Sequence, residues 1–242
     1  TTDDLIDFTP ALRAQAIKNL ESYDIGPLFH PPLHRDNDLG KEAALWCPGD
    51  MGGTNIDGPS AADPTTGILY VTSRKGCTSR IIAPGGERDA IIDEPTGKTV
   101  TDYAVLRYSR VHGPDDLPIF KPPYSRITAI DMNTGKTLWY IPVGETPAAV
   151  LNHPQLKDKQ IPNTGSGSIA KMVVTSTLLM YSDVASDGTP QLFAIDKSTG
   201  KQVGKVAISE KTNYGMMTYM HKGKQYLMLQ TGPRLTTMAL PE

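Results

Sequence analysis

Short runs of β-forming apolar residues, each bounded by turn residues, dominate the chain from Asn55 onward. Two segments are near copies: residues 128–136 read Thr-Ala-Ile-Asp-Met-Asn-Thr-Gly-Lys, and residues 193–201 read Phe-Ala-Ile-Asp-Lys-Ser-Thr-Gly-Lys. Both predict a strand, a four-residue turn with Gly at the positive-φ position, and a second strand. Residues 62–71 repeat the Asp-x-x-Thr-Gly turn before another strand. Repetition of one hairpin unit predicts a stacked or radial β-architecture.

The remaining β-rich runs extend this pattern to the end of the chain. We expect strands at 68–73, 104–108, 127–130, 138–143, 171–175, 178–182, 191–195, 204–208, 216–220, 225–230 and 236–240. Grouped in fours, these make about three four-stranded antiparallel blades of a β-propeller. A closed ring needs four to eight blades of roughly 40–45 residues each, so we predict an all-β partial propeller. The remaining blades are expected outside this sequence.

The first 50 residues follow a different pattern. Thr9 and Pro10 form an N-cap and first-turn pair ahead of apolar residues at helical spacing, which predicts a short helix at about 10–21. Residues 26–32 are Pro-rich and are expected to be irregular. We therefore divide the chain, as part of one propeller domain, into four segments. These are a lead-in at 1–50, a blade at 51–143 with a surface insertion at 74–123, a blade at 144–208, and a partial last blade at 209–242.

The composition limits the kinds of partner that the chain can bind. A net charge of −2 does not provide the excess of positive charge that favours binding to nucleic acid or to an anionic membrane. No apolar run reaches the about 18 residues that a membrane-spanning helix needs. The two cysteines, Cys47 and Cys77, are compatible either with a disulfide or with two free thiols, because geometry decides between them.

The glycine-rich segment at 49–59 is the most suggestive candidate for chemistry. Its glycines let the backbone approach a ligand, and Asn55 offers both donors and an acceptor. The alternative is a plain glycine-rich turn that leads into a strand. We interpret residues 163–168 and 230–233 as equivalent loops, so that Thr54, Asn55, Ser166 and Gly232 are candidates for one axial site. His30 and His34 flank two prolines, which excludes a shared helix face, and no metal site is predicted.

Several stretches resemble the quinoprotein dehydrogenases that use pyrroloquinoline quinone (PQQ), especially the C-terminal part of the membrane glucose dehydrogenase type. The likeness spans nearly the whole chain except the insertion. It is carried by Asp4-Leu5-Ile6-Asp7-Phe8-Thr9-Pro10, Gly26-Pro27-Leu28-Phe29, Gly52-Gly53-x-Asn55, Asp63-Pro64-x-Thr66-Gly67-Ile68-Leu69-Tyr70-Val71, Ala129-Ile130-Asp131-Met132-x-Thr134-Gly135-x-x-x-Trp139, Met217-Thr218-Tyr219 and Ala239-Leu240-Pro241.

The resemblance implies an eight-bladed, periplasmic propeller with PQQ and a calcium ion on its axis. An alcohol or an aldose sugar would be oxidised there by hydride transfer to the quinone. A separate electron acceptor, either a quinone or a cytochrome, would then reoxidise the cofactor. Asn55 matches the family asparagine that contacts the quinone. The carboxylate base and the calcium ligands lie in earlier blades of the family, so no catalytic residue is assigned in this chain.

Three positions depart from the family pattern. Ile56 stands where the family usually has Trp, Gly204 replaces the Trp of the last complete blade, and the final loop is shortened to residues 231–234. These departures favour a second hypothesis, a scaffold or binding propeller that has lost the cofactor. The glycine-rich setting of Asn55 favours the enzyme.

Overall fold

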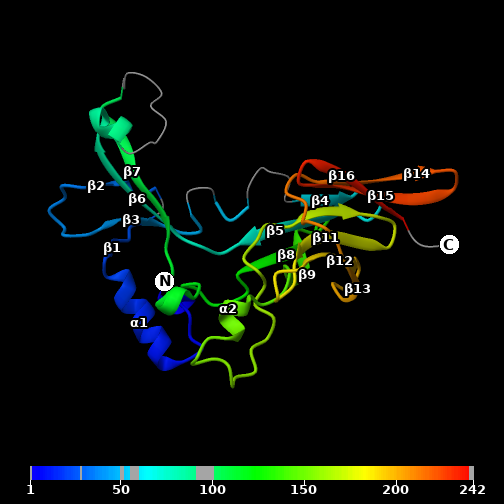
Figure 1. Ribbon diagram of the computed structural model, residues 1–242, viewed down its shortest axis with the longest axis horizontal. Coiled ribbons are helices and arrows are strands. Elements are labelled where there is room, and N and C mark those ends of the chain that lie inside the picture. The colour runs from blue at the N-terminus through cyan, green and yellow to red at the C-terminus, as the bar shows by residue number, and fades with distance from the viewer. Residues whose placement is uncertain (1, 28, 50–51, 55–59, 91–100, 240–242) are drawn as a thin grey trace. The chain divides into compact units, whose positions relative to one another are not determined.

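The structure, a computed structural model, describes residues 2–27, 29–49, 52–54, 60–90 and 101–239 (Figure 1). The chain divides into two compact units. Unit 1 comprises Thr1–Gly53 and Lys75–Lys121, and unit 2 comprises Thr54–Arg74 and Pro122–Glu242.

Unit 1 begins with the predicted helix. Helix α1 spans Pro10–Leu20, and its first turn is capped by Thr9, whose Oγ1 accepts a hydrogen bond from the Leu12 amide at 3.1 Å. Leu12 and Ala16 are its buried residues. Three short 3₁₀ helices also belong to this unit: η1 (Thr2–Asp4), η2 (Gly85–Ala90) and η3 (Pro114–Asp116). The prediction of a short N-terminal helix is confirmed.

The strands of unit 1 form one five-stranded sheet. They are β1 (Tyr23–Asp24), β2 (Leu33–His34), β3 (Ala43–Trp46), β6 (Thr78–Pro84) and β7 (Tyr103–Arg110). β6 pairs antiparallel with β3 and β7 and parallel with β2, while β1 pairs parallel with β3. A disulfide joins Cys47, just after β3, to Cys77, just before β6. Strands of the insertion therefore complete a sheet begun by the lead-in, a pairing that the sequence pattern did not predict.

Unit 2 contains three sheets and a short helix, α2 (Ala148–Leu151). The first sheet has the order β4 (Ser60–Asp63), β5 (Ile68–Arg74), β8 (Ser125–Asp131) and β9 (Lys136–Pro142). The second consists of β10 (Lys171–Val174), β11 (Leu178–Val184), β12 (Pro190–Asp196) and β13 (Gln202–Ala207). The third consists of β14 (Met216–His221), β15 (Lys224–Thr231) and β16 (Arg234–Ala239).

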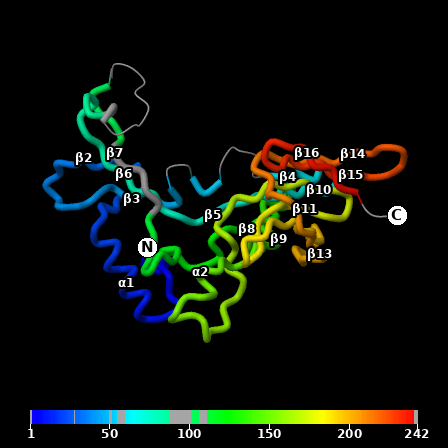
Figure 2. The backbone as a smooth tube through the Cα atoms, in the orientation of Figure 1, coloured from blue at the N-terminus to red at the C-terminus, as the bar shows by residue number. Residues whose placement is uncertain are grey.

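All neighbouring strands within these three sheets are antiparallel and are joined in sequence order. β10, the first strand of the second sheet, contacts the first strands of both other sheets, β4 and β14 (Figure 2). Sheets that meet along their first strands are the arrangement of propeller blades around an axis. The all-β, partial propeller fold is thus confirmed.

The repeated turn owes its shape to its aspartate. Asp131 Oδ1 accepts from the Asn133 amide at 2.8 Å, and its Oδ2 accepts from Thr134 Oγ1 at 2.8 Å. In the second copy, Asp196 Oδ1 accepts from the Thr199 amide at 3.0 Å. A short acidic side chain that bonds to the backbone two or three residues ahead stabilises such turns.

The main core of unit 2 lies between the first and second sheets. Its buried members are Tyr70, Ile127, Ala129, Val143, Ala170, Met172, Leu179, Tyr181, Phe193 and Ile195. Trp139 of β9 packs against this cluster, with its ring centroid 5.7 Å from that of Tyr70. A Cβ placed on Gly200, in the turn of the next sheet, would lie 2.9 Å from the Trp139 indole. Trp139 therefore packs between blades.

Candidate functional site at the loops that enter the first strands

The candidate site of unit 2 is built from the loops that lead into β4 and β10. Thr54 stands at the end of the glycine-rich segment, and its Oγ1 donates to the Thr72 carbonyl of β5 at 3.3 Å. Thr72 is itself buried, and its Oγ1 donates to the Ala170 carbonyl just before β10 at 3.3 Å. These bonds link the segment before β4 to the start of the neighbouring blade. Asn55, the principal candidate, lies outside the described residues.

Ser166 is held in a tight loop before β10. Its amide donates to the Val143 carbonyl at 2.7 Å, and its Oγ donates to Asp183 Oδ2 at 2.5 Å. Gly165 precedes it with a φ of +72°, and a Cβ there would lie 2.7 Å from the Ser125 carbonyl oxygen. The loop thus needs glycine at this position both for its backbone angle and for its close approach to the chain.

Asp183, at the end of β11, is fully buried and joins two of the loops. Beyond its bond with Ser166, its Oδ1 lies 3.9 Å from the Nζ of Lys211, which lies in the loop before β14. Lys211 also donates to Ser168 Oγ at 3.1 Å. Burial raises the pKa of Asp183 above its ordinary value, while the Ser166 hydroxyl and the Lys211 ammonium act in the opposite direction.

Neither Asp183 nor Lys211 is among the residues singled out from the sequence. The available signal was a Ser-Asp pair at the end of an apolar strand, at residues 182–183. Such a pair is common in turns, so its burial becomes visible only when the loops before β10 and β14 are placed against it. A neighbouring bond from the Thr212 amide to Ser182 Oγ, at 3.0 Å, fixes the same two segments together.

Gly232 occupies a different position from the one that the sequence suggested. Residues 230–233 do not enter a first strand. They form the hairpin between β15 and β16, in which Thr231 pairs with Arg234. The segment before β14 ends at Gly215 instead. The hairpin nonetheless packs on that segment, because a Cβ on Gly232 would clash with the Glu210 carboxylate. Gly232 therefore lies beside the residue that precedes Lys211.

No cluster of three or more potential metal-ligating side chains occurs within the described ranges. His30 is paired with a carboxylate, its Nε2 lying 2.7 Å from Asp24 Oδ2, and His34 lies in β2.

Across the same described ranges, no helix has the length and apolar character needed to cross a membrane.

Comparison with known proteins identifies the family. Residues 1–227 match the family described as "PQQ: Glucose/ethanol/alcohol dehydrogenase, beta-propeller domain". The chain is 35% identical to the glycerol dehydrogenase large subunit of Gluconobacter oxydans, covering 92% of this chain and 33% of that protein. It is 29% identical to a probable quinate dehydrogenase (quinone) of Xanthomonas campestris, covering 80% of this chain and 25% of that protein.

Among solved structures, the quinohemoprotein alcohol dehydrogenase of Comamonas testosteroni aligns with a TM-score of 0.45 and 17% identity, over 84% of this chain and 28% of that one. Because the family match covers nearly the whole chain, the chain belongs to the β-propeller domain family of the PQQ-dependent glucose, ethanol and alcohol dehydrogenases. It spans a quarter to a third of the length of the two curated relatives.

PQQ is rich in acceptors, with three carboxylates and two quinone carbonyls, so a fitting site supplies hydrogen-bond donors and cations. Lys211 meets this demand, because it carries an ammonium group and its side chain is 35% exposed. Ser166 fits less directly, because its hydroxyl proton is already donated to Asp183. The backbone amides of residues 165–168 also donate to protein atoms. The fit of the described residues to an anionic, acceptor-rich ligand therefore rests on Lys211.

Proposed function

We propose that this chain supplies the C-terminal blades of a PQQ-dependent dehydrogenase that oxidises an alcohol or a sugar. The family match over residues 1–227 carries this proposal. Relatives named for glycerol and quinate both act on hydroxylated carbon, which favours a polyol as the first substrate to test. Bound PQQ would supply the chemistry of accepting a hydride from the substrate carbon.

In this proposal Thr54 and Asn55 lie at the quinone, and the two loops that carry Ser166 and Lys211 face its carboxylates. Gly232 leaves room for Glu210 beside Lys211. Asp183 holds Ser166 and Lys211 in place through the contacts described above. The carboxylate base, the calcium ligands and the remaining blades come from outside this sequence, the compartment is the periplasm, and a quinone or a cytochrome accepts the electrons.

The proposal is tested by dye reduction with the purified protein that contains this chain, loaded with PQQ and calcium. We expect PQQ-dependent reduction of an artificial dye with glycerol, ethanol, glucose or quinate as donor. Omitting PQQ gives the background rate. A protein that retains PQQ but reduces no dye with any of these donors contradicts the enzyme assignment.

The alternative is a non-catalytic scaffold or binding propeller. Ile56 and Gly204, which replace two family tryptophans, favour it, because a propeller that has lost its cofactor no longer needs these rings. Under that alternative the protein folds normally, yet addition of PQQ leaves its melting temperature unchanged, since a ligand stabilises only the state it binds.

A further inference from the structure

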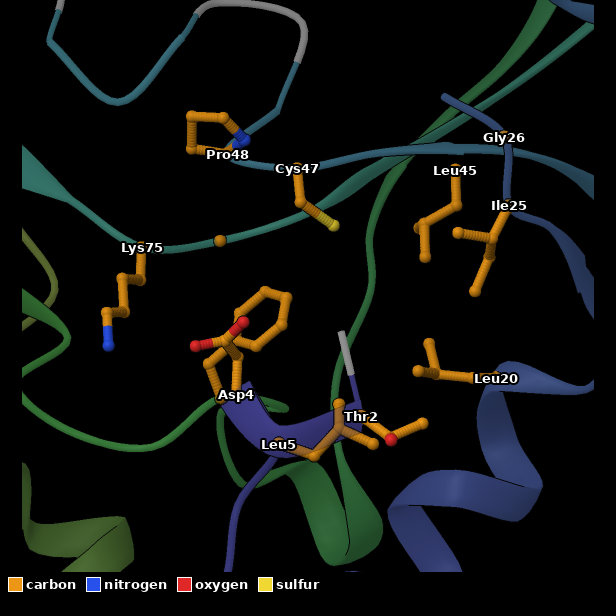
Figure 3. A pocket seen from close by; sticks show the side chains of 12 residues that line it. Thr2, Asp4, Leu5, Leu20, Ile25, Gly26, Leu45, Cys47, Pro48 and Lys75 are labelled. Atoms are coloured by element: carbon orange, nitrogen blue, oxygen red, sulfur yellow. The ribbon is translucent and has the colours of Figure 1, made fainter. Parts of the chain in front are cut away.

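Unit 1 contains a cavity of about 600 Å³ (Figure 3). Its wall is mostly apolar and comes from η1, the end of α1, β3 and the two ends of the insertion. The apolar lining consists of Leu5, Leu20, Ile25, Leu45, Pro48 and Phe120. A cavity of this volume with apolar walls and a few polar groups is typical of a site for a small organic molecule.

The two charged groups of the cavity lie on one side. Figure 3 shows Asp4 and Lys75 together, across the cavity from Leu20, Ile25 and Leu45. Both are held near one residue, Lys121: its amide donates to the Asp4 carbonyl at 2.9 Å, and Lys75 Nζ donates to its carbonyl at 3.3 Å. The cavity therefore has an apolar end and an end with one acceptor group and one donor group.

The disulfide keeps two of these walls together. Cys47 lines the cavity next to Pro48. Its bond to Cys77 ties this wall to Lys75 and Gly76, which begin the second segment of unit 1. Burial of Leu5 and Leu45, which are 0% and 5% exposed, fixes the floor. A cavity whose walls are covalently and hydrophobically fixed is largely preformed, so binding costs little ordering of the protein.

We propose that this cavity binds a neutral apolar molecule that carries a carbonyl or hydroxyl head group. The charges of Asp4 and Lys75 cancel, so the polar end favours neither an anion nor a cation. A carbonyl oxygen can accept from Lys75, and a hydroxyl can in addition donate to Asp4. A quinone with a short alkyl chain has this combination of head and body. The inference concerns unit 1 and does not rest on the proposed function of unit 2.

Calorimetric titration of the purified protein with a decyl-substituted benzoquinone tests the proposal without any turnover. We expect saturable binding with one site per chain. Ile25→Trp, which fills the apolar end from an exposed position, should weaken binding about tenfold or more, because it occupies ligand volume. Lys75→Met should weaken it by about tenfold, the effect of one lost charge-assisted hydrogen bond.

Two control variants match these changes. Leu39→Trp alters a residue of unit 1 that is as exposed as Ile25 but does not line the cavity. Lys41→Met removes a lysine that also donates to a backbone carbonyl, that of Glu21 at 2.7 Å. Both should leave the affinity unchanged. Absence of saturable binding, equal effects of the test and control variants, or tighter binding of decanoate than of the neutral quinone would overturn the proposal.

Discussion

Lys197 Nζ lies 2.6 Å from Asp63 Oδ2 and joins the turn after β12 to the turn after β4. Both side chains are almost fully buried, with 12% and 5% of their surface exposed. Tyr70 adds a second tie, because its hydroxyl donates to the Lys197 carbonyl at 3.2 Å. An ion pair therefore joins the turns of two neighbouring blades. Removal of either partner would leave the other charge buried and uncompensated.

We predict that Lys197→Met lowers the melting temperature of the protein and changes its acid sensitivity. The hydrogen bond from Lys197, with those from Thr65 and Thr66, holds the pKa of Asp63 well below its ordinary value of 3.8. The stability that Asp63 contributes is therefore fully present above that value and is lost as the pH falls toward the folded-state pKa. Denaturation midpoints measured across the acid range should fall less steeply in the variant.

The matched control for this prediction is Lys205→Met. Lys205 pairs with Glu145 at 2.5 Å, but the lysine side chain is 43% exposed, so solvent screens the pair. A control variant that destabilises the protein as much as Lys197→Met does would show that the buried pair has no special role.

We predict the opposite pH dependence at Asp183. Burial raises its pKa, so its charged form is disfavoured in the fold, and its contribution to stability declines as the pH rises from 3.8 through the folded-state pKa. Asp183→Asn should remove this decline while preserving an acceptor for Ser166. Denaturation midpoints measured at several pH values from about 4 to 7 check this.

Asp187→Asn serves as its control in the same blade, since hydrogen bonds from Thr189 lower the pKa of Asp187. The Asp187→Asn variant should be less stable than the unsubstituted protein above pH 3.8, where the charged form of Asp187 stabilises the fold. If both substitutions alter the pH profile in the same direction, the proposed environment of Asp183 is wrong.

A third prediction compares two equivalent glycines. Gly135 and Gly200 have φ values of +71° and +74° in the two copies of the turn. Alanine at either position incurs the left-handed backbone cost of about 1–2 kcal/mol. Only at Gly200 does the new Cβ also press on the Trp139 indole, whereas at Gly135 nothing lies within 4 Å.

Gly200→Ala should therefore lower the free energy of unfolding by about 1–3 kcal/mol more than Gly135→Ala, the usual effect of overpacking. Urea denaturation of the two variants measures this difference. Equal losses would mean that the Trp139 indole does not crowd the Cβ position of Gly200.

A fourth prediction addresses Asn55, whose role comes from the sequence alone. If its amide contacts the quinone, Asn55→Ala should weaken PQQ binding by about 1–3 kcal/mol, because a buried polar partner is left unsatisfied. Asn133→Ala is the control, since Asn133 lies in an exposed turn and bonds to the Thr66 carbonyl at 3.3 Å. The same loss of affinity in both variants would reduce Asn55 to a turn residue.

Most of the propeller was predictable because its signals are local. The Asp-x-x-Thr-Gly turn marks the three hairpins β4–β5, β8–β9 and β12–β13 through bonds within four residues, as at Asp131 and Thr134. The pairing of β6 with β2 and β3 was not predictable, because the sequence of a short strand does not indicate which strand it pairs with. The position of Gly232 was misjudged for a related reason: a glycine-containing turn looks alike whether it closes a hairpin or enters a first strand.

The candidate site was predictable only in part. Asn55, Thr54 and Ser166 come from glycine-rich loops and a family likeness, both of which are visible in the sequence. Asp183 and Lys211 meet only after two blades are assembled, because 28 residues separate them in sequence and neither belongs to a motif. Burial, the property that distinguishes Asp183 from the other aspartates of its blade, is a consequence of that assembly.

The central claim is that this chain forms part of a PQQ-binding propeller. Calorimetric titration of the purified protein that contains it with PQQ, in the presence of calcium, tests this most directly. The account predicts saturable binding of one PQQ per chain. A complete, folded protein that releases no binding heat and gains no thermal stability from PQQ would contradict it and favour the scaffold propeller.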